Sequence, residues 1–246
     1  MRCIISAAVF LGLMVTSLAC SSQHATLAPT APRCEYLTNP VGVDVQQPRL
    51  TWVLESPERG TRQTAYQIRV ASSPAALKTG KPDLWDSGKV KSDETIHIAY
   101  AGKPLASTQR AYWQVRVWDQ EDRASTYSTP AYWEMGLAEG DWKAQWITNA
   151  KVESAQAWEP APFFRKTFTV NKPVKSARAY VCGLGYFELS LNGNKVGDHV
   201  LDPGYTQYNK RVLYVTHDIT RQVQQGENAV GVILGNGFYN QWVKDA

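Results

Sequence analysis

A β-hairpin predicted at residues 186–196 constrains the fold of this chain more than any other feature. From Phe187 to Leu191, apolar residues alternate with polar ones, which is the period of two expected of a half-buried strand. Asn192-Gly193 then tolerates the positive φ angles of a type I′ turn, so the chain can reverse there. Further turn signals follow at residues 202–204 and 225–228, at the spacing typical of an all-β sandwich.

The first half of the chain shows the same rhythm. In residues 111–118, Trp113, Val115 and Val117 share a face, and polar residues occupy most of the opposite one. About 100 residues of short strands predict a fibronectin type III-like or immunoglobulin-like sandwich. The predicted fold class is therefore all-β, with two consecutive β-sandwiches. The first covers residues 34–137, and the second, expected to be jelly-roll-like and incomplete at its C-terminal end, covers residues 142–246.

The amino terminus has the features of an export signal. Residues 1–19 begin with Arg2 and continue with an apolar stretch too short to span a membrane. The residues before Cys20 resemble a bacterial lipobox, which predicts lipidation of Cys20, with plain cleavage near Ala19 as the alternative. Residues 20–33 are rich in Ser, Thr, Ala and Pro and are expected to form a flexible tether. We therefore expect an exported bacterial protein, periplasmic or anchored to the outer membrane as a lipoprotein.

Charge and motifs exclude several classes of function. The net charge is +4, and the Lys and Arg residues are spread along the chain, so no nucleic-acid partner is expected. The sequence has no P-loop, no dinucleotide fingerprint and no zinc-type cysteine pairing, so no cofactor and no metal are predicted. Cys34 and Cys182 fall in different sandwiches and are expected to be separate thiols.

Acidic, histidine and tryptophan residues are assigned structural roles. Asp119, Glu121 and Asp122 are interpreted as a solvated hairpin tip, with a weak calcium site as the alternative. His97, His199 and His217 are expected to be strand or turn residues. Asp198 and Asp202 flank a turn and are expected to hydrogen-bond the backbone there. Trp142 and Trp146 are expected to pack where the two domains meet.

Two long motifs carry a resemblance to a known family. The runs GLGYFELSLNGNKVGDHVLDPGYTQYNKRVLYVTHDIT at 183–220 and GENAVGVILGNGFY at 226–239 resemble the amino-terminal β-sandwich of bacterial α-L-rhamnosidases, which release terminal rhamnose. The runs RCEYLTNPVGVDVQQPRLTW, LWDSGKV and YWQVRVWDQ resemble the fibronectin-like domain that precedes that sandwich. One departure is Phe238, where the family more often has tryptophan.

The resemblance implies an accessory role. In rhamnosidases the catalytic acids lie in a large barrel of paired helices that follows these sandwiches, and no catalytic residue can be carried over to this sequence. The chain is therefore expected to be the inactive amino-terminal fragment of an α-L-rhamnosidase, whose partner is the C-terminal catalytic domain of the same protein. The alternatives are a stand-alone carbohydrate-binding surface lipoprotein and, more weakly, a structural adhesion protein.

A sugar contact remains open within the second sandwich. Some sandwiches of this family bind rhamnose, and sugar sites combine flat aromatic faces with amide or carboxylate hydrogen bonds. The candidate residues for binding rhamnose-containing glycans are Tyr205, Tyr208, Asn236, Phe238 and Tyr239. The alternative is that the two tyrosines at 205 and 208 brace a turn, and that Gly235 and Gly237 allow close packing.

Overall fold

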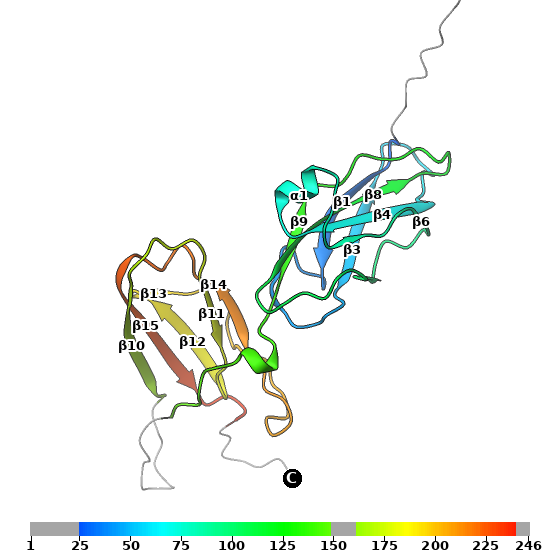
Figure 1. Ribbon diagram of the computed structural model, residues 1–246. Helices are drawn as coiled ribbons and strands as arrows, with labels where there is room; N and C mark the ends of the chain where they lie inside the picture. The colour runs from blue at the N-terminus through cyan, green and yellow to red at the C-terminus, as the bar shows by residue number, and fades with distance from the viewer. Residues whose placement is uncertain (1–24, 149–160, 240–246) are drawn as a thin grey trace, which may run out of the picture.

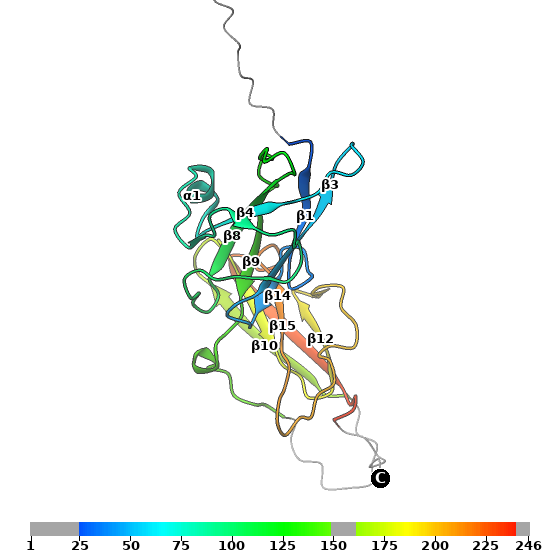
Figure 2. The ribbon, with the colours of Figure 1, turned by 90° about the vertical axis from the view of Figure 1, so that its right-hand side faces the viewer.

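The computed structural model describes residues 25–148 and 161–239, which form two β-sandwich domains joined end to end (Figures 1 and 2). The all-β prediction is confirmed, because strands dominate and the one α-helix found in the described residues, α1 (Pro74–Lys78), has five residues. Among these residues, no helix has the length and apolar character needed to cross a bilayer.

The first domain packs two sheets face to face. One sheet has the order β1 (Ala28–Cys34), β3 (Arg49–Glu55), β7 (Ile98–Ala99). The other has the order β2 (Val41–Val43), β9 (Ala131–Met135), β8 (Arg110–Trp118), β4 (Ala65–Ala71), β5 (Trp85–Asp86), and β6 (Val90–Lys91) also pairs with β4. All of these pairs are antiparallel except β2 with β9, which is parallel.

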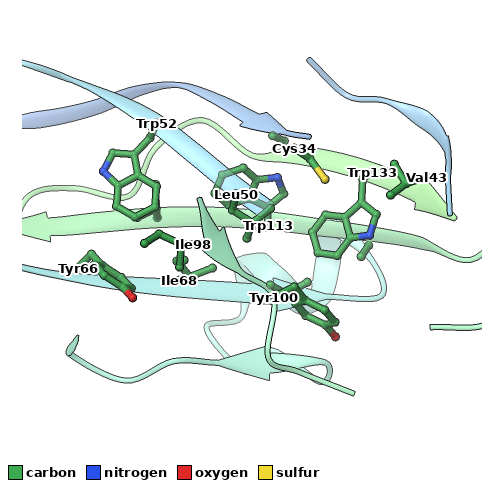
Figure 3. Packing of buried hydrophobic residues seen from close by; sticks show 14 of the residues in the cluster. Cys34, Val43, Leu50, Trp52, Tyr66, Ile68, Ile98, Tyr100, Trp113 and Trp133 are labelled. Atoms are coloured by element: carbon green, nitrogen blue, oxygen red, sulfur yellow. The ribbon is translucent and has the colours of Figure 1, made fainter. Parts of the chain in front are cut away.

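Three tryptophans fill the space between these sheets. Trp52, Trp113 and Trp133 are fully buried, and Figure 3 shows them converging with Tyr66 and Tyr100 from both sheets. Strand β8 buries alternate residues, so the face predicted at residues 113–117 is confirmed. The buried area of such aromatic side chains is the main source of stability in a small sandwich.

The first domain begins earlier than the sequence indicated. The expectation that residues 20–33 form a tether is wrong from Ala28 onward, because β1 pairs with β3 from Ala28↔Glu55 to Cys34↔Leu50. Strand β1 lies at the sheet edge, where a proline's missing amide hydrogen costs little. The pairing register shifts between Thr30 and Arg33, a bulge that accommodates the irregular segment. The signal and lipidation predictions, Cys20 included, lie outside the described residues.

The turn after β8 also differs from its prediction. Glu121 and Asp122 are exposed, but the side chain of Asp119 is completely buried, so it is not part of a solvated tip. Its carboxylate accepts hydrogen bonds from the backbone N–H groups of Glu121 (3.0 Å) and Arg123 (2.9 Å) and from Arg123 Nε (2.8 Å). Asp119 therefore organises the turn from inside.

The second domain also contains two sheets. Its four-stranded sheet has the order β10 (Phe163–Val170), β15 (Gly226–Gly235), β12 (Tyr186–Leu191), β13 (Asn194–Lys195). The facing sheet consists of β11 (Arg178–Val181) and β14 (Val215–Asp218). The predicted hairpin is confirmed, since Asn192 and Gly193 have φ angles of 52° and 82° between the paired strands β12 and β13.

The core of the second domain is small. Its fully buried apolar side chains are Phe187, Leu189, Leu191 and Val196. Strand β10 lies at the edge of its sheet, and the exposed fraction of Phe163 there is 76%. An exposed strand edge of this kind promotes association between chains, so we expect low solubility.

The connection between the domains packs through aromatic rings. The 3₁₀ turn η1 (Glu139–Asp141) leads to Trp142, whose ring meets Tyr214 edge-on at 5.0 Å between centroids and Tyr180 at 6.4 Å. The prediction that Trp142 packs at the domain junction is confirmed. The same prediction is wrong for Trp146, whose exposed fraction is 66%.

Both cysteines that the structure describes are free thiols, as expected for residues in separate sandwiches. Cys34 lies in the first core, and burial raises the pKa of its thiol to about 12. An inert thiol with this environment has a packing role.

Candidate functional site

Five aromatic rings gather at one end of the second domain, and we call them the aromatic cluster: Tyr186, Tyr205, Tyr208, Phe238 and Tyr239. Tyr205 is central, with its ring centroid 5.1 Å from that of Phe238 and 5.8 Å from that of Tyr208. The Tyr208 centroid lies 5.3 Å from that of Tyr239, and the Phe238 centroid lies 6.4 Å from that of Tyr186. These residues come from three separate segments of the chain, so the fold itself assembles the cluster.

Two glycines bring these segments together. Gly185, at φ 95°, precedes β12, and a Cβ placed there would lie 2.3 Å from the carbonyl oxygen of Gly235. A Cβ on Gly237 would lie 2.9 Å from the Cα of Gly185. Backbone therefore packs directly on backbone between the loop before β12 and the turn after β15. This contact places Tyr186, at the start of β12, beside Phe238.

The loop between β13 and β14 supplies the rings of Tyr205 and Tyr208. Burial raises the pKa of Tyr208, and its side chain also hydrogen-bonds the main chain of Gly185. Tyr208 therefore links the loop between β13 and β14 to the loop before β12. Tyr205 has no such support role, since its exposed fraction is 66%.

The cluster presents a substantial apolar surface to solvent. Phe238 and Tyr239 are 51% and 53% exposed, and Phe238 contacts Tyr205 while Tyr239 contacts Tyr208. Exposed rings gathered in this way are unusual on a monomeric surface, which makes the aromatic cluster a candidate binding face. Aromatic faces of this type bind the C–H faces of sugars, with nearby polar groups for the hydroxyls.

The structure brings together four of the five predicted residues. Asn236 is exposed on the same turn as Phe238, but within residues 25–148 and 161–239 its side chain forms no hydrogen bond. Its amide is therefore available to a ligand. Sequence reasoning missed Tyr186 as a cluster member, although its position directly after Gly-Leu-Gly was a usable signal.

A pair of polar side chains, His199 and Asp202, also lies in the second domain. His199 Nδ1 is 2.5 Å from Asp202 Oδ2, and the ring of His199 is 5.5 Å from that of His217. Burial lowers the pKa of His217, which keeps its ring neutral near pH 7. No group of three or more His, Cys, Asp or Glu side chains suited to a metal occurs in the part of the chain that the structure describes.

Comparison with protein families identifies both domains. The family described as Rha78A-like, N-terminal immunoglobulin domain matches residues 29–139, and the alpha-L-rhamnosidase N-terminal domain matches residues 172–246. The chain carries the two amino-terminal domains of α-L-rhamnosidases. This agrees with the resemblance seen in the sequence and with the order of the two sandwiches in the fold.

Individual α-L-rhamnosidases show the same relationship. One from Formosa agariphila is 41% identical over 231 residues, covering 85% of this chain and 24% of that protein. The α-L-rhamnosidase structure from Dictyoglumus thermophilum is 44% identical, with a TM-score of 0.80, over 86% of this chain and 25% of that one. The α-L-rhamnosidase structure from Aspergillus terreus is 29% identical, with a TM-score of 0.76, and the match covers 87% of this chain and 24% of that one. The chain thus spans about a quarter of the length of the α-L-rhamnosidases it matches.

Proposed function

We propose that this chain is the amino-terminal, non-catalytic region of an exported α-L-rhamnosidase that hydrolyses terminal α-L-rhamnose from glycosides. The observation that carries the proposal is the ordered match of both domains to rhamnosidase amino-terminal domains. By itself this region is inactive, because glycoside hydrolysis of the usual kind needs two carboxylates about 5 to 10 Å apart flanking the bond. The aromatic cluster contains no carboxylate.

Within this role, the aromatic cluster contacts rhamnose-containing glycans. Tyr205 and Phe238 present exposed ring faces, and the free amide of Asn236 supplies hydrogen bonds to sugar hydroxyls. Because the rings at positions 205, 238 and 239 stay largely exposed to solvent, we expect weak binding, with dissociation constants of about 1 mM.

The test is a titration of the chain with L-rhamnose, followed by NMR. The Tyr205→Ala and Asn236→Ala double variant is expected to lose rhamnose binding while keeping the wild-type midpoint of thermal unfolding. Phe163→Ala is a matched control, since it removes another exposed ring of the same domain outside the cluster. Rhamnose binding that survives in the double variant would restrict the cluster to a packing role.

Export and lipid anchoring through Cys20 are part of the proposal. Changing Cys20 to Ala is expected to move the protein from the membrane fraction to the soluble one. A Ser21→Ala variant next to it serves as the control and is expected to stay membrane-bound. Membrane retention of the Cys20→Ala variant would contradict a lipid anchor at this residue.

The alternative of a stand-alone carbohydrate-binding surface lipoprotein makes a different prediction. An antibody against the second domain would then detect a cellular protein of about 27 kDa. The rhamnosidase proposal expects a band roughly four times larger, given the share of its relatives that the chain spans.

A further inference from the structure

A cleft lies at the boundary between the two domains, away from the aromatic cluster. It has a volume of about 860 Å³. The first domain contributes Arg110, Tyr112 and Glu134, and the second contributes Lys175, Arg178 and Arg221. Because both domains line the cleft, it exists only when they are packed together.

The cleft contains a set of paired charges centred on the buried side chains of Glu134 and Arg178. Glu134 accepts from Arg178 Nε at 2.6 Å and Arg178 Nη2 at 2.9 Å, across the domain boundary. The same carboxylate accepts from Arg110 of its own domain at 2.8 Å and 3.0 Å. Asp218 Oδ1 lies 2.8 Å from Arg178 Nη1. Two guanidinium groups and two carboxylates therefore cancel in charge.

The rim of the cleft is not neutral. Lys175 and Arg221 are exposed, and in the described part of the chain neither side chain has a hydrogen bond or an ion pair. Since the paired charges cancel, these two side chains leave the cleft with two uncompensated positive charges. A concave surface with an excess of one sign concentrates ligands of the opposite sign.

The uncharged lining suits a ligand that carries many hydroxyl groups. Thr108 and Ser176 present hydroxyls, and Tyr112 presents a half-buried ring. Hydroxyl groups and a ring face bind a saccharide, whereas a small inorganic anion would use the two cations alone.

We propose that this interdomain cleft binds an acidic saccharide, with a carboxylate of the sugar held by Lys175 and Arg221. The choice of a saccharide over other anions rests on the proposed function, which places glycans next to this chain. The charge excess stands independently of that function, because it follows from the ion pairs alone.

The experiment titrates the full chain with an oligosaccharide of galacturonic acid at low ionic strength, using calorimetry. This probe has carboxylates but no rhamnose, so it does not depend on rhamnose recognition by the aromatic cluster. The Lys175→Gln and Arg221→Gln double variant is expected to bind about tenfold more weakly. Lys172→Gln with Lys210→Gln removes the same charge from exposed residues outside the cleft and is expected to bind as wild type.

Three outcomes would overturn the proposal. Equal losses in the two double variants would mean that net charge alone attracts the probe. Equal affinity for the carboxyl-reduced, neutral oligosaccharide would exclude a role for the cations, and equal affinity for inorganic sulfate would exclude recognition of the sugar. Tyr205→Ala is expected to leave this binding unchanged, so failure of rhamnose binding and failure of the cleft proposal are distinguishable.

Discussion

At the scale of single residues, Asp119 shows how a buried charge can order a turn. A carboxylate out of contact with water is costly unless it is fully hydrogen-bonded, and three donors surround this one. Two of the donors belong to Arg123, so removal of the carboxylate would leave two backbone N–H groups without their acceptor and would leave Arg123 paired with Glu121 alone.

We expect Asp119→Ala to lower the free energy of unfolding by about 3 kcal/mol, measured by urea denaturation. The matched control is Glu121→Ala, which removes an exposed carboxylate from the same turn and is expected to change stability by less than about 0.5 kcal/mol. Equal effects of the two substitutions would contradict the role assigned to Asp119.

The contribution of Asp119 should also depend on pH. Burial opposes ionisation, but the hydrogen bonds from Arg123 outweigh it and lower the pKa of Asp119 below its ordinary value of 3.8. The unfolded chain therefore takes up the proton first, and the stabilisation is present above pH 3.8 and lost as the pH falls through the folded-state pKa. The difference in unfolding free energy between wild type and Asp119→Ala should shrink below pH 4. A difference that is constant from pH 7 to pH 3 would show that ionisation does not matter.

At the scale of elements, the contact between the loop before β12 and the turn after β15 assembles the aromatic cluster. Its key feature is the absence of a side chain at Gly185, where both the positive φ angle and the neighbouring carbonyl exclude a Cβ. Gly193 in the hairpin has a similar φ angle of 82° but open space around it.

We therefore expect Gly185→Ala to cost about 3 kcal/mol or more, since it adds a clash to backbone strain. Gly193→Ala is the control, and it should cost only about 1 kcal/mol for its φ angle. Gly185→Ala should also change the tyrosine and phenylalanine NMR signals of the cluster, while Gly193→Ala should leave them in place. A small effect of Gly185→Ala would mean that the backbone contact is dispensable.

The turns and strand faces that could be predicted from the sequence are those determined by neighbouring residues. The turn at Asn192-Gly193 and the buried face of β12 follow from neighbouring residues, and both were predicted. Strand β1 was missed because its stability comes from pairing with β3, which follows later in the chain, and not from its own Pro-rich sequence. Burial of Asp119 was missed for the same reason, because a sequence pattern shows charge but not the donors around it.

At the scale of the whole molecule, Glu134 joins the two domains. It lies 44 positions from Arg178, and no sequence pattern indicated that the two would pair. Hydrogen bonding to Glu134, which outweighs burial, raises the pKa of Arg178, so this guanidinium stays charged. A buried pair of this type contributes orientation more than net stability, because desolvation offsets its attraction.

We expect Glu134→Ala and Arg178→Ala each to cost about 3 kcal/mol, because each removes the buried partner of the other charge and leaves only Arg110 for Glu134 or Asp218 for Arg178. The double variant should cost clearly less than the sum, by about 1 to 3 kcal/mol, since neither charge then remains. Thermal and urea unfolding of the four proteins give this coupling energy. Additive costs would show that the two side chains do not act together across the boundary.

We propose that these two domains form a non-catalytic region of an α-L-rhamnosidase that contacts rhamnose through the aromatic cluster. Saturation-transfer NMR with p-nitrophenyl α-L-rhamnopyranoside tests both parts in one sample. We expect saturation transfer to the C–H protons of the sugar, and we expect this transfer to be weaker in Tyr205→Ala. No p-nitrophenol should be released. Release of p-nitrophenol in proportion to the protein, or no transfer to the sugar, would contradict the proposal.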